Sequence, residues 1–467
     1  MDYMTLFGEK KLVDNLDYPH NDIGMARLFY DLHHNIICYV IEAKTWYIYR
    51  GRFWKKDEGS LYAMELCKDF AQALIAYAEA KDDGSDESKL FIKYVAGFHS
   101  RRRRESLLSD ARSIAPKSLN AFDHDRMLFN CQNGTFDLRE MALRPHSPAD
   151  YITKMARAKF VEDAACERWD MFINEIMCVD ADAAKFLQKA LGYCLSGDTS
   201  LECFFILYGS TTRNGKSTLT ETVAHILGDY AKTAQPQSLS RRPSDGSAAS
   251  PDIARLKGAR LINVPEPEKA MELNIALIKQ LTGGDTYTAR YLNENPVEFR
   301  PEGKIFINTN HLPRAADDTV FSSGRVKLIP FDRHFTEGEQ DTGLKKLFRK
   351  QKNMSGILNW LIEGYRLLQA EGLILPPRVL SAISAYRSEA DIFGMFIEES
   401  TMPQEGIRVA TSELYAAYML WAKDNGYRPL NSKNFVGELR RRFDVRRSGT
   451  VGNVVVGLKI APRQMTA

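Results

Sequence analysis

Residues 203–227 read CFFILYGSTTRNGKSTLTETVAHIL and combine three local patterns in one short stretch. The first six residues form a continuous apolar run, which is typical of a buried strand in a parallel sheet. A loop that contains Gly-Lys-Ser follows, and a helical pattern then ends at Gly228. A strand, a glycine-containing loop and a helix in this order predict an α/β fold with a phosphate-binding loop.

The residue types of this loop suit contact with a nucleotide. Backbone N–H groups of a tight loop and a helix N-terminus bind phosphate oxygens, and Gly215 would let the backbone approach closely. Lys216 is expected to reach the β- and γ-phosphates of ATP, and the Ser217 hydroxyl is expected to bind Mg²⁺. The predicted cofactor-binding residues are Gly209, Ser210, Thr211, Thr212, Arg213, Asn214, Gly215, Lys216, Ser217 and Thr218.

The spacing of the loop differs from the usual motif. That motif has four residues between its two glycines, whereas five residues separate Gly209 from Gly215. Either Ser210 takes the place of the first glycine, or the loop carries one extra residue. A Gly-Lys-Ser turn without a ligand is a third alternative, which the flanking strand and helix disfavour.

Two further apolar runs predict strands that end in polar residues. Residues 261–264 (LINV) precede Glu266 and Glu268, and residues 304–309 (KIFINT) precede Asn310. One carboxylate would hold Mg²⁺ through water, a role we give to Glu266, and the other would orient the attacking water. Asn310 would lie beside the γ-phosphate. The alternatives are an exposed acidic turn and an amide that caps a turn.

Arg325 begins another strand-like run, VKLIPF, at residues 326–331. An arginine at a strand start near a subunit edge could stabilise charge on the phosphoryl group of a neighbour's ATP. The predicted catalytic residues are therefore Lys216, Glu266, Glu268, Asn310 and Arg325.

Charge is distributed unevenly along the 467 residues, although the net charge is only +3. Residues 428–463 hold nine Lys or Arg against two acidic residues, a local excess of +7. A basic end on a slightly acidic body fits a nucleic-acid-binding module, and a solvated basic face fits equally well.

Cysteine usage and hydropathy indicate the cellular setting. The seven cysteines show no C-x-x-C spacing and none of the nine histidines completes a zinc site, so free thiols in a reducing cytoplasm are expected. No apolar run reaches about 18 residues and the first residues lack a signal-peptide core, so no membrane association is predicted.

The last part of the chain, residues 386–463, is expected to fold separately. Helices are predicted at 391–399, 412–424 and 434–442, the third with Ser432 as its N-cap, and strands at 445–447 and 454–458. Helices followed by a glycine-linked hairpin predict a winged helix that binds DNA, or alternatively one that binds protein. The predicted DNA contacts here are Lys433, Arg440, Arg441, Arg442, Arg446 and Arg447.

Residues 125–331 resemble the C-terminal region of phage and plasmid primases and the poxvirus primase–helicase, in superfamily three of the AAA+ ATPases. The first ~110 residues are similar to that family's N-terminal helicase-associated segment, less distinctly. The motifs that carry the resemblance are NGTFDL (133–138), LRPHSP (143–148), LGY (191–193), SGDT (196–199), NGKST (214–218), LIKQLTGGD (277–285), TAR (288–290), NTNH (308–311) and LIPF (328–331).

The resemblance implies a hexameric ring that hydrolyses ATP between subunits and threads DNA through its centre. Arg325 matches the second arginine of a family pair whose first position is Gly324 here, and Arg314 is a reserve candidate for the arginine finger. Residues 287–299 should form a hairpin in the channel, without the lysine that the family often has near its tip. The predicted DNA contacts of this region are Lys279, Arg290 and Asn293.

The predicted fold is an α/β AAA+ P-loop core with a mixed, mostly helical N-terminal domain and a C-terminal winged-helix domain. The expected divisions are an N-terminal helicase-associated domain (1–160), a helical collar (161–200), the helicase core (201–335), a helical linker or lid (336–385) and the winged helix (386–467).

The predicted function is an ATP- and Mg²⁺-dependent DNA helicase of a phage, plasmid or mobile-element replication module. Its partners would be single-stranded and forked or origin DNA, further copies of itself in a hexamer, and a separate primase or polymerase, in the cytoplasm of a bacterial or phage-infected cell. A primase is disfavoured because no domain with paired catalytic carboxylates precedes the helicase-associated segment. The alternative is an AAA+ origin-binding or loading factor without processive unwinding.

Overall fold

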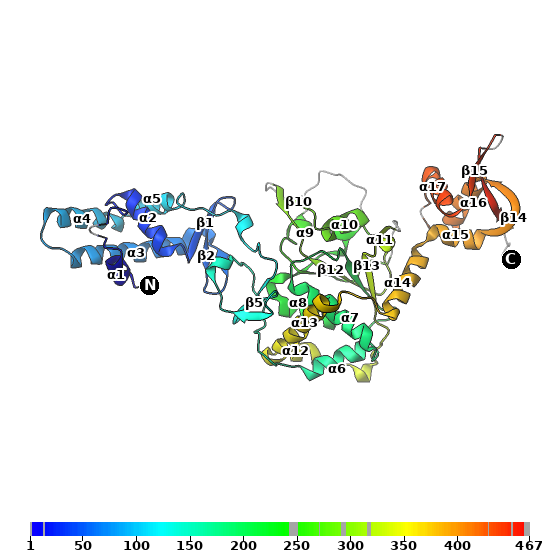
Figure 1. Cartoon of the computed structure of the whole chain (residues 1–467), viewed down its shortest axis with the longest axis horizontal. Coiled ribbons are helices and arrows are strands. Elements are labelled where there is room, and N and C mark those ends of the chain that lie inside the picture. The colour runs from blue at the N-terminus through cyan, green and yellow to red at the C-terminus, as the bar shows by residue number, and fades with distance from the viewer. Residues whose placement is uncertain are drawn as a thin grey trace.

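The computed structural model describes residues 2–12, 15–241, 251–269, 271–290, 296–314, 319–427, 429–449 and 452–461. The chain is elongated, with a helix-rich N-terminal region at one end, a central parallel sheet, and a small C-terminal unit at the other end (Figure 1). In the part that is described, no helix is long and apolar enough to cross a membrane.

The N-terminal region packs helices around an aromatic core beside a small antiparallel sheet in the order β1-β2-β3. Its elements are α1 (Tyr3–Glu9), α2 (Asp22–His33), β1 (Ile37–Val40), β2 (Thr45–Tyr49), β3 (Trp54–Lys56), α3 (Leu61–Ala80), α4 (Asp86–Ala96) and α5 (Arg101–Ala111). Phe70 lies in the centre of this core, with its ring 5.8 Å from that of Phe7 and 5.4 Å from that of Phe29. The helix α3 covers a stretch with a 3.6-residue apolar spacing, residues 61–80, and the chain turns at Gly51, whose φ is +77°.

A second antiparallel sheet, β4-β5-β6, joins the N-terminal region to the centre of the molecule. It consists of β4 (Leu128–Cys131), β5 (Gly134–Asp137) and β6 (Ala142–Arg144). The Asn133-Gly134 pair, a common hairpin turn, connects β4 to β5, with Cys131 opposite Gly134 in the register. The buried guanidinium of Arg260 donates from Nη2 to the Leu128 carbonyl at 2.8 Å and from Nη1 to the Leu195 carbonyl. This arginine therefore connects β4 to the segment that leads into the central sheet.

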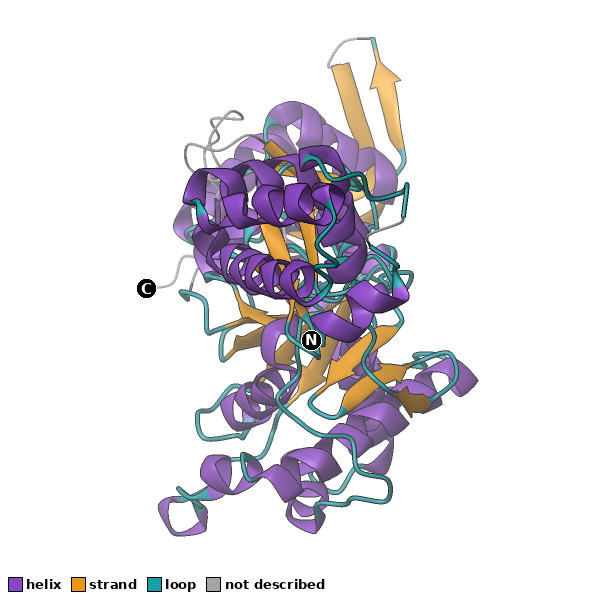
Figure 2. Cartoon of the chain, turned by 90° about the vertical axis from the view of Figure 1, so that its left-hand side faces the viewer, coloured by secondary structure: helices purple, strands orange, loops and turns teal. Residues whose placement is uncertain are grey.

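The central sheet has five parallel strands in the order β13-β7-β12-β9-β8. The strands are β7 (Phe204–Tyr208), β8 (Ala231–Thr233), β9 (Leu261–Val264), β12 (Lys304–Thr309) and β13 (Val326–Pro330). The connecting elements are α8 (Lys216–Leu227), α9 (Pro251–Ala254), α10 (Ile275–Thr282), the hairpin β10 (Tyr287–Arg290) and β11 (Pro296–Phe299), and α11 (Thr319–Ser322). Helices lie on both sides of the strands, with α10 above them and α8 below them in Figure 1. In the end-on view of Figure 2, the helices of the N-terminal region lie in front of this sheet. Because all five strands are parallel, their carboxyl ends meet at one edge, where α/β proteins commonly bind ligands.

The two faces of this sheet pack against different cores. Phe205 and Phe306 lie on the face that packs against Leu219 of α8, and their rings stack at 4.5 Å. Ile305 and Ile307 lie on the opposite face with the residues of α10 and α11. Side chains of a strand alternate between faces, so each strand residue can be assigned to one of these two sides.

Four helices form a layer beneath the α8 face: α6 (Glu167–Ile176), α7 (Ala181–Gly192), α12 (Leu344–Phe348) and α13 (Gln351–Glu371). Both α6 and α7 lie in the segment 161–200, for which the sequence predicted helical structure. Close packing of α7 on α13 depends on two glycines. A Cβ atom on Gly364 would lie 2.3 Å from the Gln188 carbonyl oxygen, and one on Gly192 would lie 2.4 Å from the Tyr365 nitrogen.

The C-terminal unit contains helices and a three-stranded antiparallel sheet in the order β14-β16-β15. Its elements, with the helix α14 that precedes it, are α14 (Pro377–Ala390), α15 (Ile392–Ser400), β14 (Thr401–Ala410), α16 (Thr411–Asp424), α17 (Ser432–Arg442), β15 (Val445–Ser448) and β16 (Gly452–Ile460). The three predicted helices and the predicted hairpin are confirmed, whereas β14 was not predicted. The predicted N-cap Ser432 is wrong by one residue, because the Asn431 side chain accepts the hydrogen bond from the Asn434 N–H at 2.9 Å.

Candidate nucleotide site

Three predicted residues from different elements meet at the carboxyl edge of the central sheet. The Lys216 ammonium, at the start of α8, donates to Asn310 Oδ1 at 2.7 Å. The Asn310 N–H in turn donates to Glu266 Oε1 at 3.3 Å. Asn310 follows β12, and β12 lies between the strand that precedes the loop and the strand that precedes Glu266. The sheet order thus brings together side chains that lie 94 and 44 residues apart in the sequence.

The loop geometry favours one explanation for its unusual spacing. A Cβ atom on Gly209 would lie 2.3 Å from Asn214 Nδ2 and 2.6 Å from the Phe331 carbonyl oxygen, so only glycine fits there. Ser210, by contrast, is exposed. Gly209 therefore occupies the crowded first position of the loop, and the loop carries one extra residue.

The second glycine is required for two reasons. Gly215 has a φ of +87°, a conformation that residues with a Cβ atom rarely adopt. A Cβ atom there would also lie 2.5 Å from Ile176 Cγ2, because α6 packs directly against the loop. The loop is braced from the other side by the segment after β13, where the Phe335 N–H donates to the Arg213 carbonyl at 2.9 Å.

The first turn of α8 gives this loop its chemistry. The first N–H groups of an α-helix have no partner within the helix and lie at the positive end of its dipole, so they attract phosphate. The twelve residues of α8 begin at Lys216, directly after the tight turn at Gly215. The loop between the two glycines and the first turn of α8 are therefore a candidate site at which backbone N–H groups could bind a polyphosphate.

Lys216 is 6% exposed, and burial lowers the pKa of its ammonium to about 8, although the charge of Glu266 raises the pKa. The phosphate groups of a bound nucleotide would add negative charge beside the ammonium and favour its protonated form. The free site therefore holds a cation at neutral pH that is stabilised further when an anion binds.

The oxygen-bearing side chains of the site suit Mg²⁺. Ser217, Glu266 and Glu268 are exposed at the same edge as Lys216, and Gln237 Nε2 donates to Glu268 Oε1 at 3.5 Å. Mg²⁺ is commonly held by one or two carboxylates together with substrate phosphates and several waters. Within the described ranges no group of three or more His, Cys, Asp or Glu side chains is placed to hold a metal ion.

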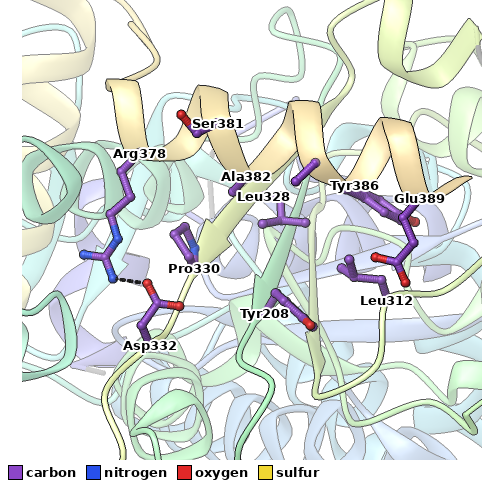
Figure 3. A pocket seen from close by; sticks show the side chains of 11 residues that line it. Tyr208, Leu312, Leu328, Pro330, Asp332, Arg378, Ser381, Ala382, Tyr386 and Glu389 are labelled. Carbon is purple, nitrogen blue, oxygen red and sulfur yellow. Dashed lines mark hydrogen bonds and ion pairs between the residues drawn. The ribbon is translucent and has the colours of Figure 1, made fainter.

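A separate pocket of about 440 Å³ lies beside the start of the loop, between α14 and the ends of β7 and β13 (Figure 3). Arg378 of α14 donates from Nη2 to Asp332 Oδ2 at 2.6 Å and from Nη1 to the Met177 carbonyl at 2.7 Å. Leu328, which also lines this pocket, belongs to the core on the face opposite α8. This pocket is therefore separated by the sheet from the side on which Lys216 lies.

Arg325 lies at the opposite edge of the sheet from Lys216, because it directly precedes β13 while the loop follows β7. Its Nη1 donates to the Glu202 carbonyl at 3.2 Å and to Thr282 Oγ1 at 2.9 Å, and its Nη2 pairs with the Glu202 carboxylate. The reserve candidate Arg314 is exposed, with its guanidinium 5.6 Å from the centre of the Tyr427 ring. Among the contacts described for Arg325 and Arg314, none is with Lys216, Asn310 or Glu266.

The candidate DNA contacts of the core lie around the β10–β11 hairpin. Arg290 is exposed at the end of β10, and the Lys279 ammonium donates to Thr319 Oγ1. Asn293 lies outside the described residues. The hairpin itself is confirmed by four antiparallel residue pairs.

The basic residues of the C-terminal unit differ in their surroundings. Lys433, Arg440 and Arg447 are exposed. Arg441 pairs with Glu438 at 2.8 Å and Arg446 with Asp444 at 2.7 Å. Arg442 makes two hydrogen bonds to Asp391, at 2.6 and 2.9 Å, which tie α17 to the start of α15. Arg442 therefore has a structural role in this unit.

Two asparagines inside the buried strands received no role from the sequence, although Asn308 is part of the NTNH motif (308–311). Asn263 in β9 and Asn308 in β12 contact each other, with Asn308 Nδ2 donating to Asn263 Oδ1 at 2.7 Å. Each could have been recognised from the sequence as the single amide side chain in an otherwise apolar run, INV at residues 262–264 and FIN at residues 306–308.

Together, the parallel sheet and the loop between β7 and α8 have the strand–loop–helix arrangement of a P-loop α/β fold. Three family models match the chain: "D5 N terminal like" over residues 26–178, a "Family of unknown function" over 207–325, and "Poxvirus D5 protein-like" over 388–451. Together with the helicase-named viral relatives below, these matches support the primase–helicase family for this chain.

Curated viral relatives are similar over most of the chain. A protein of Acanthamoeba polyphaga mimivirus, named "Putative helicase", is 28% identical over 83% of this chain and 44% of its own length. Another of the same description from Frog virus 3 is 24% identical over 87% of this chain and 55% of its own length. The chain thus spans about half the length of these relatives.

The solved structure of the NrS-1 C-terminal region has a similar fold. Its TM-score is 0.52, with 10% identity over 94% of this chain and 99% of that chain. At this identity the likeness concerns the fold alone.

Proposed function

We propose that this chain is an ATP- and Mg²⁺-dependent DNA helicase of the superfamily-three AAA+ type that acts in DNA replication. The observation that carries the proposal is the contact of Lys216 with Asn310, and of Asn310 with Glu266, at the carboxyl edge of a parallel sheet. The helicase names of the viral relatives support this assignment.

In this proposal the loop holds the polyphosphate of ATP through backbone N–H groups, and the Lys216 ammonium binds the β- and γ-phosphates. Mg²⁺, bound by Ser217 and through water by Glu266, would neutralise charge on the phosphates. Glu268 orients the water that attacks the γ-phosphorus. Asn310 holds Lys216 before the nucleotide binds and contacts the γ-phosphate afterwards.

Arg325 acts on the ATP of a neighbouring subunit in the proposed mechanism. Its position at the start of β13 places it at the edge of the sheet opposite Lys216, so an action on its own nucleotide is excluded by the topology. An arginine finger contributed in trans requires an oligomer, and we propose a hexameric ring. The contacts with Glu202 and Thr282 would then have to break when the ring forms.

We further propose that residues 386–467 form a winged-helix DNA-binding domain, in which α17 is the recognition helix and the β15–β16 hairpin is the wing. Exposed Lys433, Arg440 and Arg447 support this role. The proposed division of the remaining chain is that predicted from the sequence, at residues 160, 200, 335 and 385.

The proposal is tested by ATP hydrolysis with and without single-stranded DNA, together with unwinding of a forked duplex. The native chain should hydrolyse ATP, DNA should stimulate hydrolysis, and Lys216→Ala should abolish both activities. Full DNA-stimulated hydrolysis by Lys216→Ala would refute the assignment of the site.

A second candidate is an AAA+ origin-binding or loading factor, in which ATP controls assembly alone. The cluster of exposed basic residues on α17 and β15 favours it, because the C-terminal unit could then make the main DNA contact. Hydrolysis that depends on Lys216, without strand displacement on any fork, would select this candidate. The setting in a phage or plasmid replication module, the cytoplasmic location and a separate primase or polymerase partner remain predictions.

A further inference from the structure

The two strands that lead to Glu266 and Asn310 each carry one asparagine in an otherwise apolar core. Asn308 of β12 is 7% exposed, and Asn263 of β9 is half-buried. Asn308 Nδ2 donates to Asn263 Oδ1 at 2.7 Å and more weakly to the Val264 carbonyl at 3.4 Å. These two bonds fix the orientation of the Asn308 amide.

Strand alternation places both asparagines on the same face as the proposed ATP site. Leu261 and Phe306 belong to the core beneath α8, and Asn263 and Asn308 follow them by two residues. Asn310 follows Asn308 by two residues again and contacts Lys216. The asparagine pair thus forms the layer between the apolar core and the residues that would bind the nucleotide.

The carbonyl oxygen of the Asn308 side chain is buried and, among the described residues, accepts no hydrogen bond. A buried acceptor without a partner is destabilising, and native proteins usually pair such an atom with an ordered water or a ligand. The adjacent site would be occupied by a nucleotide with Mg²⁺, an ion that keeps several of its waters when it binds to protein. A water of this shell donates hydrogen bonds and so fits the unpaired oxygen.

We propose that Asn308 is a positioning residue, whose Oδ1 accepts a hydrogen bond from a water in the hydration shell of the nucleotide-bound Mg²⁺, while Asn263 holds the amide in that orientation. This inference rests on the proposed function, since it assumes that the Lys216 site binds Mg²⁺ and ATP. It adds Asn308, a residue of the sheet interior, to a metal site that would otherwise consist of exposed side chains.

The test measures binding of a non-hydrolysable ATP analogue with Mg²⁺ and with EDTA. Asn308→Leu removes the oxygen while keeping a similar volume. Asn308→Asp keeps an oxygen acceptor, and a turn of the Asn263 amide lets its Nδ2 donate to the second carboxylate oxygen, which replaces the present bond between the two side chains. Loss of one water-mediated hydrogen bond should reduce the Mg²⁺-dependent gain in affinity roughly three- to tenfold in Asn308→Leu. Affinity in EDTA should stay within about twofold of native, and Asn308→Asp should keep most of the gain.

Asn359 provides a matched control, because its Oδ1 is also buried and unpaired among the described residues while its Nδ2 donates to backbone carbonyls in the helical layer. Asn359→Leu should leave the Mg²⁺-dependent gain unchanged. If Asn308→Leu does not fold, Asn263→Ala replaces it and should lower the same gain.

The inference is overturned if Asn308→Leu keeps the full gain, or if Asn308→Leu and Asn308→Asp lose it equally while melting temperatures stay native. Failure of the proposed function gives a different result, because the native chain itself would then show no Mg²⁺-dependent gain and no hydrolysis that depends on Lys216.

Discussion

Nucleotide affinity should fall at alkaline pH because of the environment of Lys216. Burial lowers the pKa of its ammonium to about 8 in the free protein. Bound polyphosphate should return the pKa to near its usual value of about 10.4, so the complex keeps a proton that the free protein loses between these two values. The affinity for ATP is expected to decrease about fifteenfold between pH 8 and pH 9.5.

The same linkage predicts a measurable uptake of protons on binding. Calorimetric titration in buffers of different ionisation enthalpy should show about 0.1 proton taken up at pH 7 and about 0.9 at pH 9.5. At pH 9.5 the phosphates of ATP do not interfere, because their last ionisation is complete below pH 8. At pH 7 they still carry part of a proton, so the small uptake by Lys216 is read there after subtraction of the proton that the phosphates release. The stability of the ligand-free protein should change with pH in the opposite direction to the ATP affinity. Because the pKa of Lys216 is lower in the folded than in the unfolded chain, the free energy of unfolding should increase as pH rises through about 8 to 10.4.

Lys216→Arg is the control, since its guanidinium stays charged throughout this range. This variant should bind ATP more weakly at neutral pH, with an affinity that does not depend on pH above 8. A native affinity that is flat from pH 8 to pH 9.5, with no proton uptake, would show that the buried ammonium does not bind the phosphates.

Three further outcomes follow from the packing of individual residues. Gly209→Ala should reduce the nucleotide affinity measured by fluorescence titration at least about tenfold, because the added Cβ would lie 2.6 Å from a backbone carbonyl oxygen. A native affinity in this variant would instead favour Ser210 as the residue that takes the place of the first glycine. Arg440→Ala should weaken DNA binding and lower the dependence of binding on salt, without changing the melting temperature. Arg442→Ala should lower the melting temperature. The reverse pattern would contradict a DNA contact by Arg440 and a structural role for Arg442. Gly364→Ala should destabilise the chain by about 1–3 kcal/mol in thermal unfolding, while Gly338→Ala, where nothing lies within 4 Å, should be close to neutral; equal losses would refute the packing argument.

Local patterns were sufficient for the elements that the sequence predicted correctly. The strand, loop and helix around Lys216 are contiguous, so their order alone indicated a phosphate-binding loop. The convergence of Lys216, Asn310 and Glu266 was expected from the series of motifs, but the insertion of β12 between β7 and β9 is a long-range property. No local pattern specifies which strands become neighbours.

The elements that were missed or misplaced have identifiable causes. β14 contains Pro403 and Gly406 and is largely exposed, which weakens every strand signal, and its pairing shifts register between Pro403 and Arg408. Both Asn431 and Ser432 are good N-cap residues, and only the observed first turn distinguishes them. The contacts of Arg325 with Glu202 join residues 123 positions apart, so no spacing rule could indicate them.

The buried guanidinium of Arg260 has a practical consequence for anyone who wishes to express a shorter piece of this chain. A fragment that starts at residue 161 or 201 would lose the Leu128 carbonyl that accepts from Arg260, and also the hydrogen bond from the Asn130 N–H to the Tyr230 hydroxyl. A fragment from residue 161 would keep the Leu195 carbonyl and one from residue 201 would lose both acceptors of Arg260, and a buried charge that loses an acceptor is destabilising. Trimmed versions intended for crystallisation or nucleotide screening should therefore begin upstream of Leu128 and carry the β4–β6 sheet along with the P-loop core.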